Sequence, residues 1–137
     1  MGNRRKSREL ALQAMFFLDV NDTDFEAGLQ GFCDQHEDAL NDAVKPFFWE
    51  LVNGTMEKRG DIDQMLNRWA KNWKISRMPV VDRNMMRLAV FEMMYCPDIP
   101  PSVSINEAVE IGKKYGTRDS GPFINGVLDR IRVQEKL

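Results

Sequence analysis

Apolar residues recur every three to four positions along nearly the whole chain, which is the spacing of amphipathic helices. Leu10, Ala14, Phe17 and Leu18 follow this spacing and predict a first helix over about residues 4 to 20. The sequence shows no strand-like alternation of any length, no internal repeat and no low-complexity tract. The pattern therefore predicts an all-α protein.

Three more predicted helices lie before residue 74. Their apolar stripes are Phe25, Leu29, Phe32 and Leu40 in the second helix, Phe48, Leu51, Val52 and Thr55 in the third, and Ile62, Met65, Leu66 and Trp69 in the fourth. Pro46 suits the start of the third helix, where proline is tolerated. Asp61 is the predicted N-cap of the fourth helix, because its side chain can accept a hydrogen bond from a free backbone N–H.

Three helices are predicted after Pro79. Their inward residues are Val81, Met85, Leu88, Ala89 and either Phe91 or Met93 in the fifth helix, and Ile124, Val127, Leu128 and Ile131 in the seventh. The proline-rich stretch 96–101 predicts a stiff extended connector. Ser104 and Glu107 form a capping-box pattern that predicts the start of the sixth helix. Gly116 suits a left-handed cap at its end, and Ser120 is the predicted cap of the seventh helix.

The length of 137 residues fits one compact domain and is too short for a cofactor domain plus a substrate domain. The reading is seven helices in two small sub-bundles, over about residues 4–73 and 79–135, connected near 74–80. The formal net charge is −2, which by itself does not suggest a nucleic-acid partner.

The charges are segregated along the chain, and this changes that first impression. Four cations stand among the first eight residues, eight acids and no Lys or Arg stand between 19 and 42, and eight cations against three acids stand between 58 and 87. A surface divided in this way attracts a polyanion at one place and repels it at another.

Residues for catalysis or metal binding are scarce. The single histidine, His36, forms half of a zinc-ligand spacing with Cys33, and no second pair follows. Phosphate-binding glycine loops and nucleophile elbows are missing. We therefore expect no enzyme, no metal and no cofactor. Two cysteines, no secretory signal and no long apolar run predict a reduced, soluble, cytoplasmic protein.

The basic leader, Arg4, Arg5, Lys6 and Arg8, is the most informative feature. Arg4 and Arg8 are one helical turn apart, so they share a face that can meet successive phosphates. A solvated terminus with ordinary charges is the alternative interpretation.

Two features of the seventh helix also stand out. Gly126 lies inside it at a cost of about 1 kcal/mol relative to alanine. A close approach by another helix is the favoured explanation, with Asn125 bonded to a neighbouring backbone, and a ligand is the alternative. Phe123, near the helix start, is either core or a platform for an unpaired base.

Four stretches, residues 4–16, 81–93, 99–116 and 123–131, together resemble the bacterial transcription antitermination family NusB. The most specific parts are Ile-Asn-Glu-Ala-Val at 105–109 and Phe-Ile-Asn-Gly-Val-Leu-Asp at 123–129. Phe16 stands where the family commonly has tyrosine, and Gly112 where it often has alanine. The resemblance implies a NusB-like fold of two three-helix sub-bundles.

The resemblance also implies binding of the single-stranded boxA element of nascent ribosomal RNA, a heterodimer with the small-subunit ribosomal protein NusE, and antitermination by RNA polymerase. By family pattern, the residues implied for RNA are Arg4, Arg5, Lys6, Arg8, Arg87 and Phe123. The residues implied for NusE are Phe16, Asp82 and Asp119.

Two other readings are weighed against this one. A purely structural helical interaction module would make the basic leader incidental. An RNA-recognition piece of a ribosomal RNA methyltransferase would require a Rossmann-type domain downstream. The sequence leaves open a homodimer that covers the RNA face.

Overall fold

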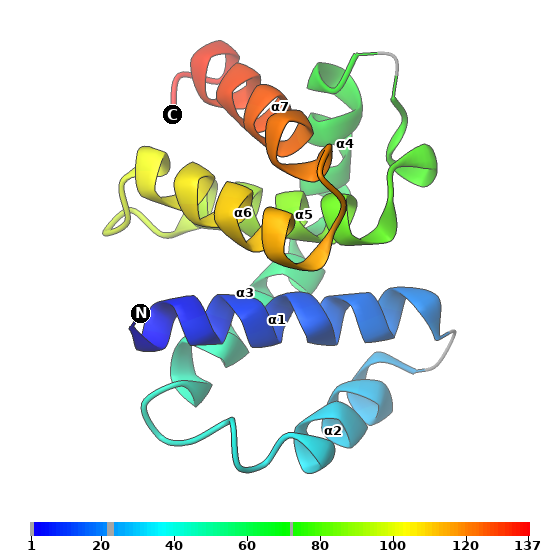
Figure 1. The fold of residues 1–137 in the computed structure, drawn as a ribbon, viewed down its shortest axis with the longest axis vertical. Coiled ribbons are helices and arrows are strands. Elements are labelled where there is room, and N and C mark those ends of the chain that lie inside the picture. The colour runs from blue at the N-terminus through cyan, green and yellow to red at the C-terminus, as the bar shows by residue number, and fades with distance from the viewer. Residues whose placement is uncertain (1, 22–23, 72) are drawn as a thin grey trace.

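The computed structural model describes residues 2–21, 24–71 and 73–137, and this part of the chain contains seven α-helices and one short 3-10 helix (Figure 1). The elements are α1 (Asn3–Val20), α2 (Phe25–Gln35), α3 (Lys45–Glu57), α4 (Arg59–Trp69), η1 (Ile75–Arg77), α5 (Val80–Tyr95), α6 (Pro101–Tyr115) and α7 (Ser120–Gln134). The prediction of an all-α protein with seven helices is confirmed.

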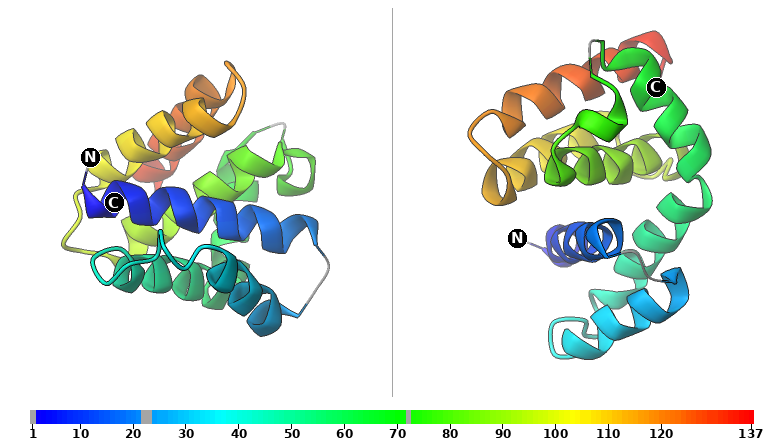
Figure 2. Two further views of the ribbon diagram at one scale, coloured as in Figure 1. Left: turned by 60° about the horizontal axis from the view of Figure 1, so that its bottom comes forward. Right: turned by 90° about the vertical axis from the view of Figure 1, so that its right-hand side faces the viewer.

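Helix α1 runs through the middle of the molecule, with α2 and α3 on one side and α5, α6 and α7 on the other (Figures 1 and 2). Helix α5 contacts α1, α3, α4, α6 and α7. The sequence interpretation places α4 in the sub-bundle of the first three helices, and in the structure α4 contacts α3 as well as α5 and α7. The apolar face of α4 carries Ile62 and Leu66, which are both fully buried.

A single cluster of buried apolar side chains draws on all seven helices. Met85, Leu88 and Ala89 of α5 are buried as predicted, and both Phe91 and Met93 join them. Val81, the first residue of that predicted stripe, is only partly buried. The predicted α7 stripe is buried along its whole length. Within the described residues, no helix has the combined length and apolar character that a membrane span requires.

The predicted N-caps at Asp61 and Ser104 are wrong. Only Lys58 separates the end of α3 from the start of α4 at Arg59, so Asp61 lies in the first turn of α4. A carboxylate there still interacts favourably with the helix dipole. Helix α6 begins at Pro101, which fits the first turn of a helix. Ser104 and Glu107 therefore lie inside α6, and both side chains bond to other helices instead of capping their own.

The turn between α6 and α7 depends on Gly116 and Ser120. Gly116 does not have the predicted left-handed conformation, since its φ is −101°. A Cβ at Gly116 would collide with Ser120 Oγ and with a carbonyl oxygen of the preceding turn. Ser120 is the first residue of α7, one position later than a cap, and its Oγ accepts a 3.0 Å hydrogen bond from the backbone N–H of Thr117.

The close helix approach predicted at Gly126 occurs instead at Gly112. A Cβ on Gly112 would collide with Cδ1 of Ile124, so this glycine allows α6 and α7 to pack tightly. At Gly126 a Cβ would meet nothing within 4 Å. The packing explanation for Gly126 is therefore wrong, and the glycine faces open space.

Candidate functional surfaces

The residues singled out in the sequence lie at three places on the surface and in buried hydrogen-bond networks. Arg4, Arg5 and Lys6 form the leader surface at the N-terminal end of α1. Phe16 lies about 16 Å further along the same helix, at a rise of 1.5 Å per residue. Phe16 is 39% exposed and lines a hollow of about 270 Å³ together with Val81.

The arginines of the leader surface are held by carboxylates of this chain. Arg4 lies 3.1 Å from Asp98 Oδ2, and its guanidinium stands 4.8 Å from the centre of the Phe47 ring. Arg5 donates two 2.6 Å hydrogen bonds to Glu107. These bonds hold the pKa of Glu107 below its ordinary value. Phosphates that contact either arginine must therefore compete with a carboxylate.

Arg8 is buried and is not presented to solvent. Its guanidinium makes two 2.8 Å hydrogen bonds to the carboxylate of Glu92, which also accepts a 2.9 Å bond from Ser104 Oγ. Arg8 and Glu92 are 3% and 1% exposed. This pair joins α1, α5 and α6, so contact between Arg8 and RNA would require the helices to separate.

Arg87 lies in a second buried network and is 3% exposed. It donates to both oxygens of Asp63 at 2.9 and 3.1 Å, to Asn84 at 2.9 Å and to Asp19 at 3.3 Å. Burial acts to raise the pKa of Asp19, and hydrogen bonds from Arg83 and Asn84 outweigh it, so the pKa is lowered. Arg87 therefore links α5 to α1 and α4.

Phe123 lies away from the leader surface and from Phe16, beside Trp73. The two rings meet edge to face with their centres 6.0 Å apart, and we call this pair the ring ridge. Trp73 is 47% exposed. A hollow of about 250 Å³ on one side of the ring ridge is also lined by Asp82 and Asp119. The structure therefore brings together one residue expected at RNA and two expected at a protein partner.

Asp82 and Asp119 differ in their accessibility. Asp82 is 3% exposed and accepts a 2.7 Å hydrogen bond from Ser120 Oγ. Burial raises the pKa of Asp82 despite that bond. Asp119 is exposed on the turn before α7. Asp82 thus positions the α6–α7 turn, while Asp119 is available to a partner.

The comparisons with known proteins identify the same family over nearly the whole chain. The sequence profile of the NusB family matches residues 5–132. The transcription antitermination protein NusB of Desulforapulum autotrophicum is 56% identical over 137 residues, covering 100% of this chain and 96% of that protein. The chain belongs to the NusB family. It is accordingly a transcription antitermination factor and not an enzyme.

Solved structures of NusB proteins have the same fold. NusB from T. maritima is 37% identical, with a TM-score of 0.79 over 98% of this chain and 94% of that one. A chain from a crystal structure of the antitermination factors NusB and NusE in complex with dsRNA has a TM-score of 0.86 at 23% identity. It covers 96% of this chain and 97% of that one, and at this identity it shows the fold alone.

For this NusB-family chain, sequence reasoning missed the cations that remain unpaired. Within the described residues, no carboxylate pairs with the following cations: Lys6, Lys45, Lys58, Lys71, Lys74, Arg77, Arg118, Arg130 and Lys136. Lys71, Lys74 and Arg77 flank Trp73 in the cation-rich stretch 58–87. Aromatic residues among cations, as in 69–77, were the signal that could have identified this surface.

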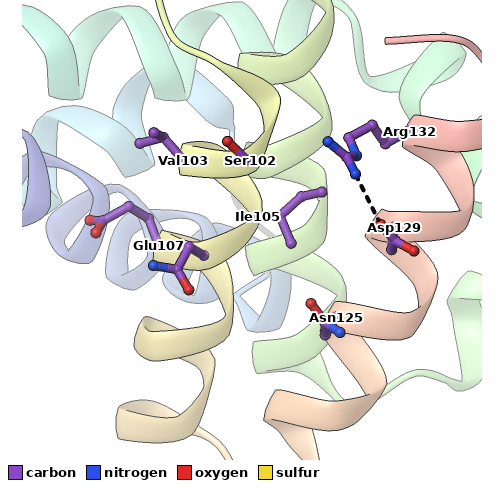
Figure 3. A pocket seen from close by; sticks show the side chains of 8 residues that line it. Ser102, Val103, Ile105, Glu107, Asn125, Asp129 and Arg132 are labelled. Atoms are coloured by element: carbon purple, nitrogen blue, oxygen red, sulfur yellow. Dashed lines mark ion pairs between the residues drawn. The ribbon is translucent and has the colours of Figure 1, made fainter.

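The remaining candidates have structural surroundings. Figure 3 shows the hollow of about 470 Å³ between α6 and α7, where Asp129 pairs with Arg132 at 3.6 Å and Glu107 points away toward α1. Asn125 lines this hollow and, among the described residues, does not make the predicted backbone bond. His36 Nδ1 lies 2.8 Å from the Phe32 carbonyl oxygen, and no metal-binding cluster occurs in the described ranges.

Proposed function

We propose that this NusB-family protein binds the boxA element of nascent ribosomal RNA together with NusE in the cytoplasm. In this assembly it promotes antitermination by RNA polymerase in ribosomal RNA operons. The observation that carries the proposal is the family match over residues 5–132. A similar fold in a complex of NusB and NusE with dsRNA supports it.

The geometry supports a division of labour in RNA binding. Arg4, Arg5 and Lys6 are accessible at one end of α1, and cations there contribute affinity that falls as salt rises. Phe123, in the ring ridge, offers an aromatic ring to an unpaired base. Arg8 and Arg87 act indirectly, because their buried ion pairs hold the helices that carry these surfaces.

The proposed NusE surface is the opposite end of α1. Phe16 is exposed beside Val81, and Asp119 is exposed on the α6–α7 turn. Asp82 supports this surface through Ser120 without facing the partner itself. An exposed aromatic anchor and an accessible carboxylate suit a protein partner.

Fluorescence anisotropy with a labelled single-stranded RNA that carries a boxA element tests the proposal. Binding is measured at two salt concentrations, with and without NusE. The variant Arg4→Gln/Arg5→Gln/Lys6→Gln should bind more weakly and reduce the slope of log affinity against log salt by about 2, at roughly 0.7 per phosphate contact. Lys58→Gln/Lys113→Gln/Lys136→Gln removes as many cations elsewhere and is the matched control. If both variants bind the RNA as tightly as the unchanged protein does, the result contradicts the proposal.

A further inference from the structure

Gly126 is a glycine for which the protein's own packing gives no reason. It lies inside α7, where glycine costs about 1 kcal/mol relative to alanine. Added Cβ atoms at Gly54, Gly112 and Gly121 would run into Phe91, Ile124 and Lys113, so those three glycines serve internal packing. A Cβ at Gly126 would meet nothing within 4 Å. The bare backbone there is open to a molecule from outside.

Gly126 lies in a hollow of about 300 Å³ between the end of α4 and α7, which we call the α4–α7 groove. The groove is lined by Trp69, Lys71, Trp73, Phe123, Gly126 and Arg130, among others. Trp73 and Phe123 also line the hollow beside Asp82, so the ring ridge separates two adjoining depressions. The α4–α7 groove therefore continues the surface to which Phe123 belongs.

The charges of the α4–α7 groove favour an anion. Within the described part of the chain, neither Lys71 nor Arg130 has a carboxylate partner. Glu135 already accepts a 2.7 Å bond from the Trp69 indole and a 3.3 Å bond from Arg68. The two arginines of the leader surface, in contrast, are bonded to carboxylates, Arg4 to Asp98 and Arg5 to Glu107.

We propose that the α4–α7 groove binds one nucleotide of single-stranded RNA. The inference rests on the proposed RNA-binding function and extends it to Lys71, Trp73 and Arg130, which neither the sequence motifs nor the family pattern assigned to RNA. The base stacks against the rings of Trp73 and Phe123 and lies over the backbone at Gly126. Stacking on aromatic rings accepts any base, so the site does not require a particular nucleotide. Lys71 and Arg130 contact the adjoining phosphates. An acidic segment of a protein partner would fit the cations but would not use the flat floor at Gly126.

The test uses a substitution whose effects on stability and on RNA binding have opposite signs. Gly126→Leu fills the floor of the groove and should raise the melting temperature by a few degrees, since leucine is the better helix former. It should weaken binding of the labelled boxA RNA by about tenfold or more, in the range of one lost stacking contact. Gly31→Leu is the matched control, because Gly31 is an exposed glycine inside α2 with no atom within 4 Å of an added Cβ.

Each outcome decides the inference. Weaker RNA binding by Gly126→Leu alone, with NusE binding unchanged, supports the groove as an RNA site. Equal RNA affinity in both variants overturns the groove while the proposed function stands. Loss of NusE binding by Gly126→Leu with RNA affinity retained would make the groove a protein surface and overturn the RNA assignment. If the unchanged protein with NusE does not bind boxA RNA, the proposed function fails, and the inference fails with it.

Discussion

The leader surface and the surroundings of the ring ridge both carry cations, but the arginines of the leader surface are bonded to carboxylates of this chain. At the leader surface, Arg4 and Arg5 are bonded to Asp98 and Glu107. At the ring ridge, the neighbouring cations Lys71, Lys74 and Arg77 have no carboxylate partner among the described residues. A cluster of cations in the sequence is therefore not the same as a free positive surface. The difference predicts that RNA must displace internal carboxylates at the leader surface but not at the ring ridge.

The largest expected effect separates the buried part of the basic leader from its accessible part. Arg8→Met leaves the Glu92 carboxylate uncompensated in the core, and we expect a loss of about 3–5 kcal/mol in the free energy of unfolding. Urea denaturation measures it. Arg4→Met, at an exposed position of the same helix, is the control and should change stability by less than about 1 kcal/mol.

A second variant distinguishes a lost charge pair from lost packing. Arg8→Met/Glu92→Met removes both charges and should recover most of the lost stability, because an apolar pair of similar volume replaces a buried ion pair at little cost. If the double variant is as unstable as Arg8→Met, the hydrogen bond from Ser104 to Glu92 contributes more than the ion pair does.

The next largest effect concerns the ring ridge. Trp73→Ala should lower RNA affinity by about 1–3 kcal/mol, the range for one base stacked on an aromatic ring. Trp49→Ala is a matched control, since Trp49 is also a partly exposed tryptophan (41%) that stacks on one phenylalanine, Phe48. Anisotropy titrations of both variants check the prediction. Equal losses in RNA affinity would show that the ring ridge has no special part in binding.

A smaller effect should appear when the leader surface is freed from its own carboxylate. Glu107→Gln leaves Arg5 without an ionised partner, so we expect RNA affinity to rise by less than about 1 kcal/mol, the usual scale of a partly exposed ion pair. The salt dependence should steepen by about 0.7 if Arg5 then contacts a phosphate. Glu110→Gln removes an exposed acid that pairs with Lys113 on the same helix, and should leave binding unchanged. Weaker RNA binding by Glu107→Gln would mean that the carboxylate positions Arg5 for RNA.

The sequence predicted the helices well because their apolar stripes are local, and helix spacing alone identifies them. It misplaced the caps at Asp61 and Ser104 because a capping pattern also fits residues inside a helix whose side chains bond elsewhere. The burial of Arg8 and Arg87 depends on Glu92, Asp63 and Asp19, which are distant in the sequence. Such pairings follow from tertiary packing, and no local pattern reveals them.

The packing of α4 and the position of Gly126 illustrate the same limit. A stripe such as Ile62 and Leu66 shows that α4 has a buried face but does not say which helices cover it. A glycine inside a helix signals either a close approach or an open floor, and only the atoms around it decide. The sequence likewise indicated Phe123 either as core or as a platform for a base but not its contact with Trp73, because the two residues are distant in the chain.

The smallest expected effect concerns the pH dependence of stability. The pKa values of Glu107 and Asp82 are shifted in opposite directions. The Glu107 pKa is lowered, so its contribution to stability is present above its ordinary pKa of 4.5 and is lost as pH falls through the folded-state pKa. The Asp82 pKa is raised by burial, so the folded state binds a proton more readily than the unfolded chain does. Stability therefore decreases as pH rises from the ordinary 3.8 through the raised pKa.

Asp82→Asn should remove this cost while its amide oxygen still accepts the bond from Ser120 Oγ. We expect the free energy of unfolding at pH 7 to increase by at most about 1 kcal/mol, the net scale of one polar interaction. The gain should vanish as pH falls below the ordinary pKa of 3.8. Urea denaturation at several pH values measures it, with Asp119→Asn as the exposed control. A less stable Asp82→Asn protein at pH 7 would mean that the ionised carboxylate gains more from Ser120 than burial costs it. The α6–α7 turn would then depend on the ionised carboxylate of Asp82. The ring ridge would resemble the leader surface, where the ionised carboxylate of Glu107 positions Arg5.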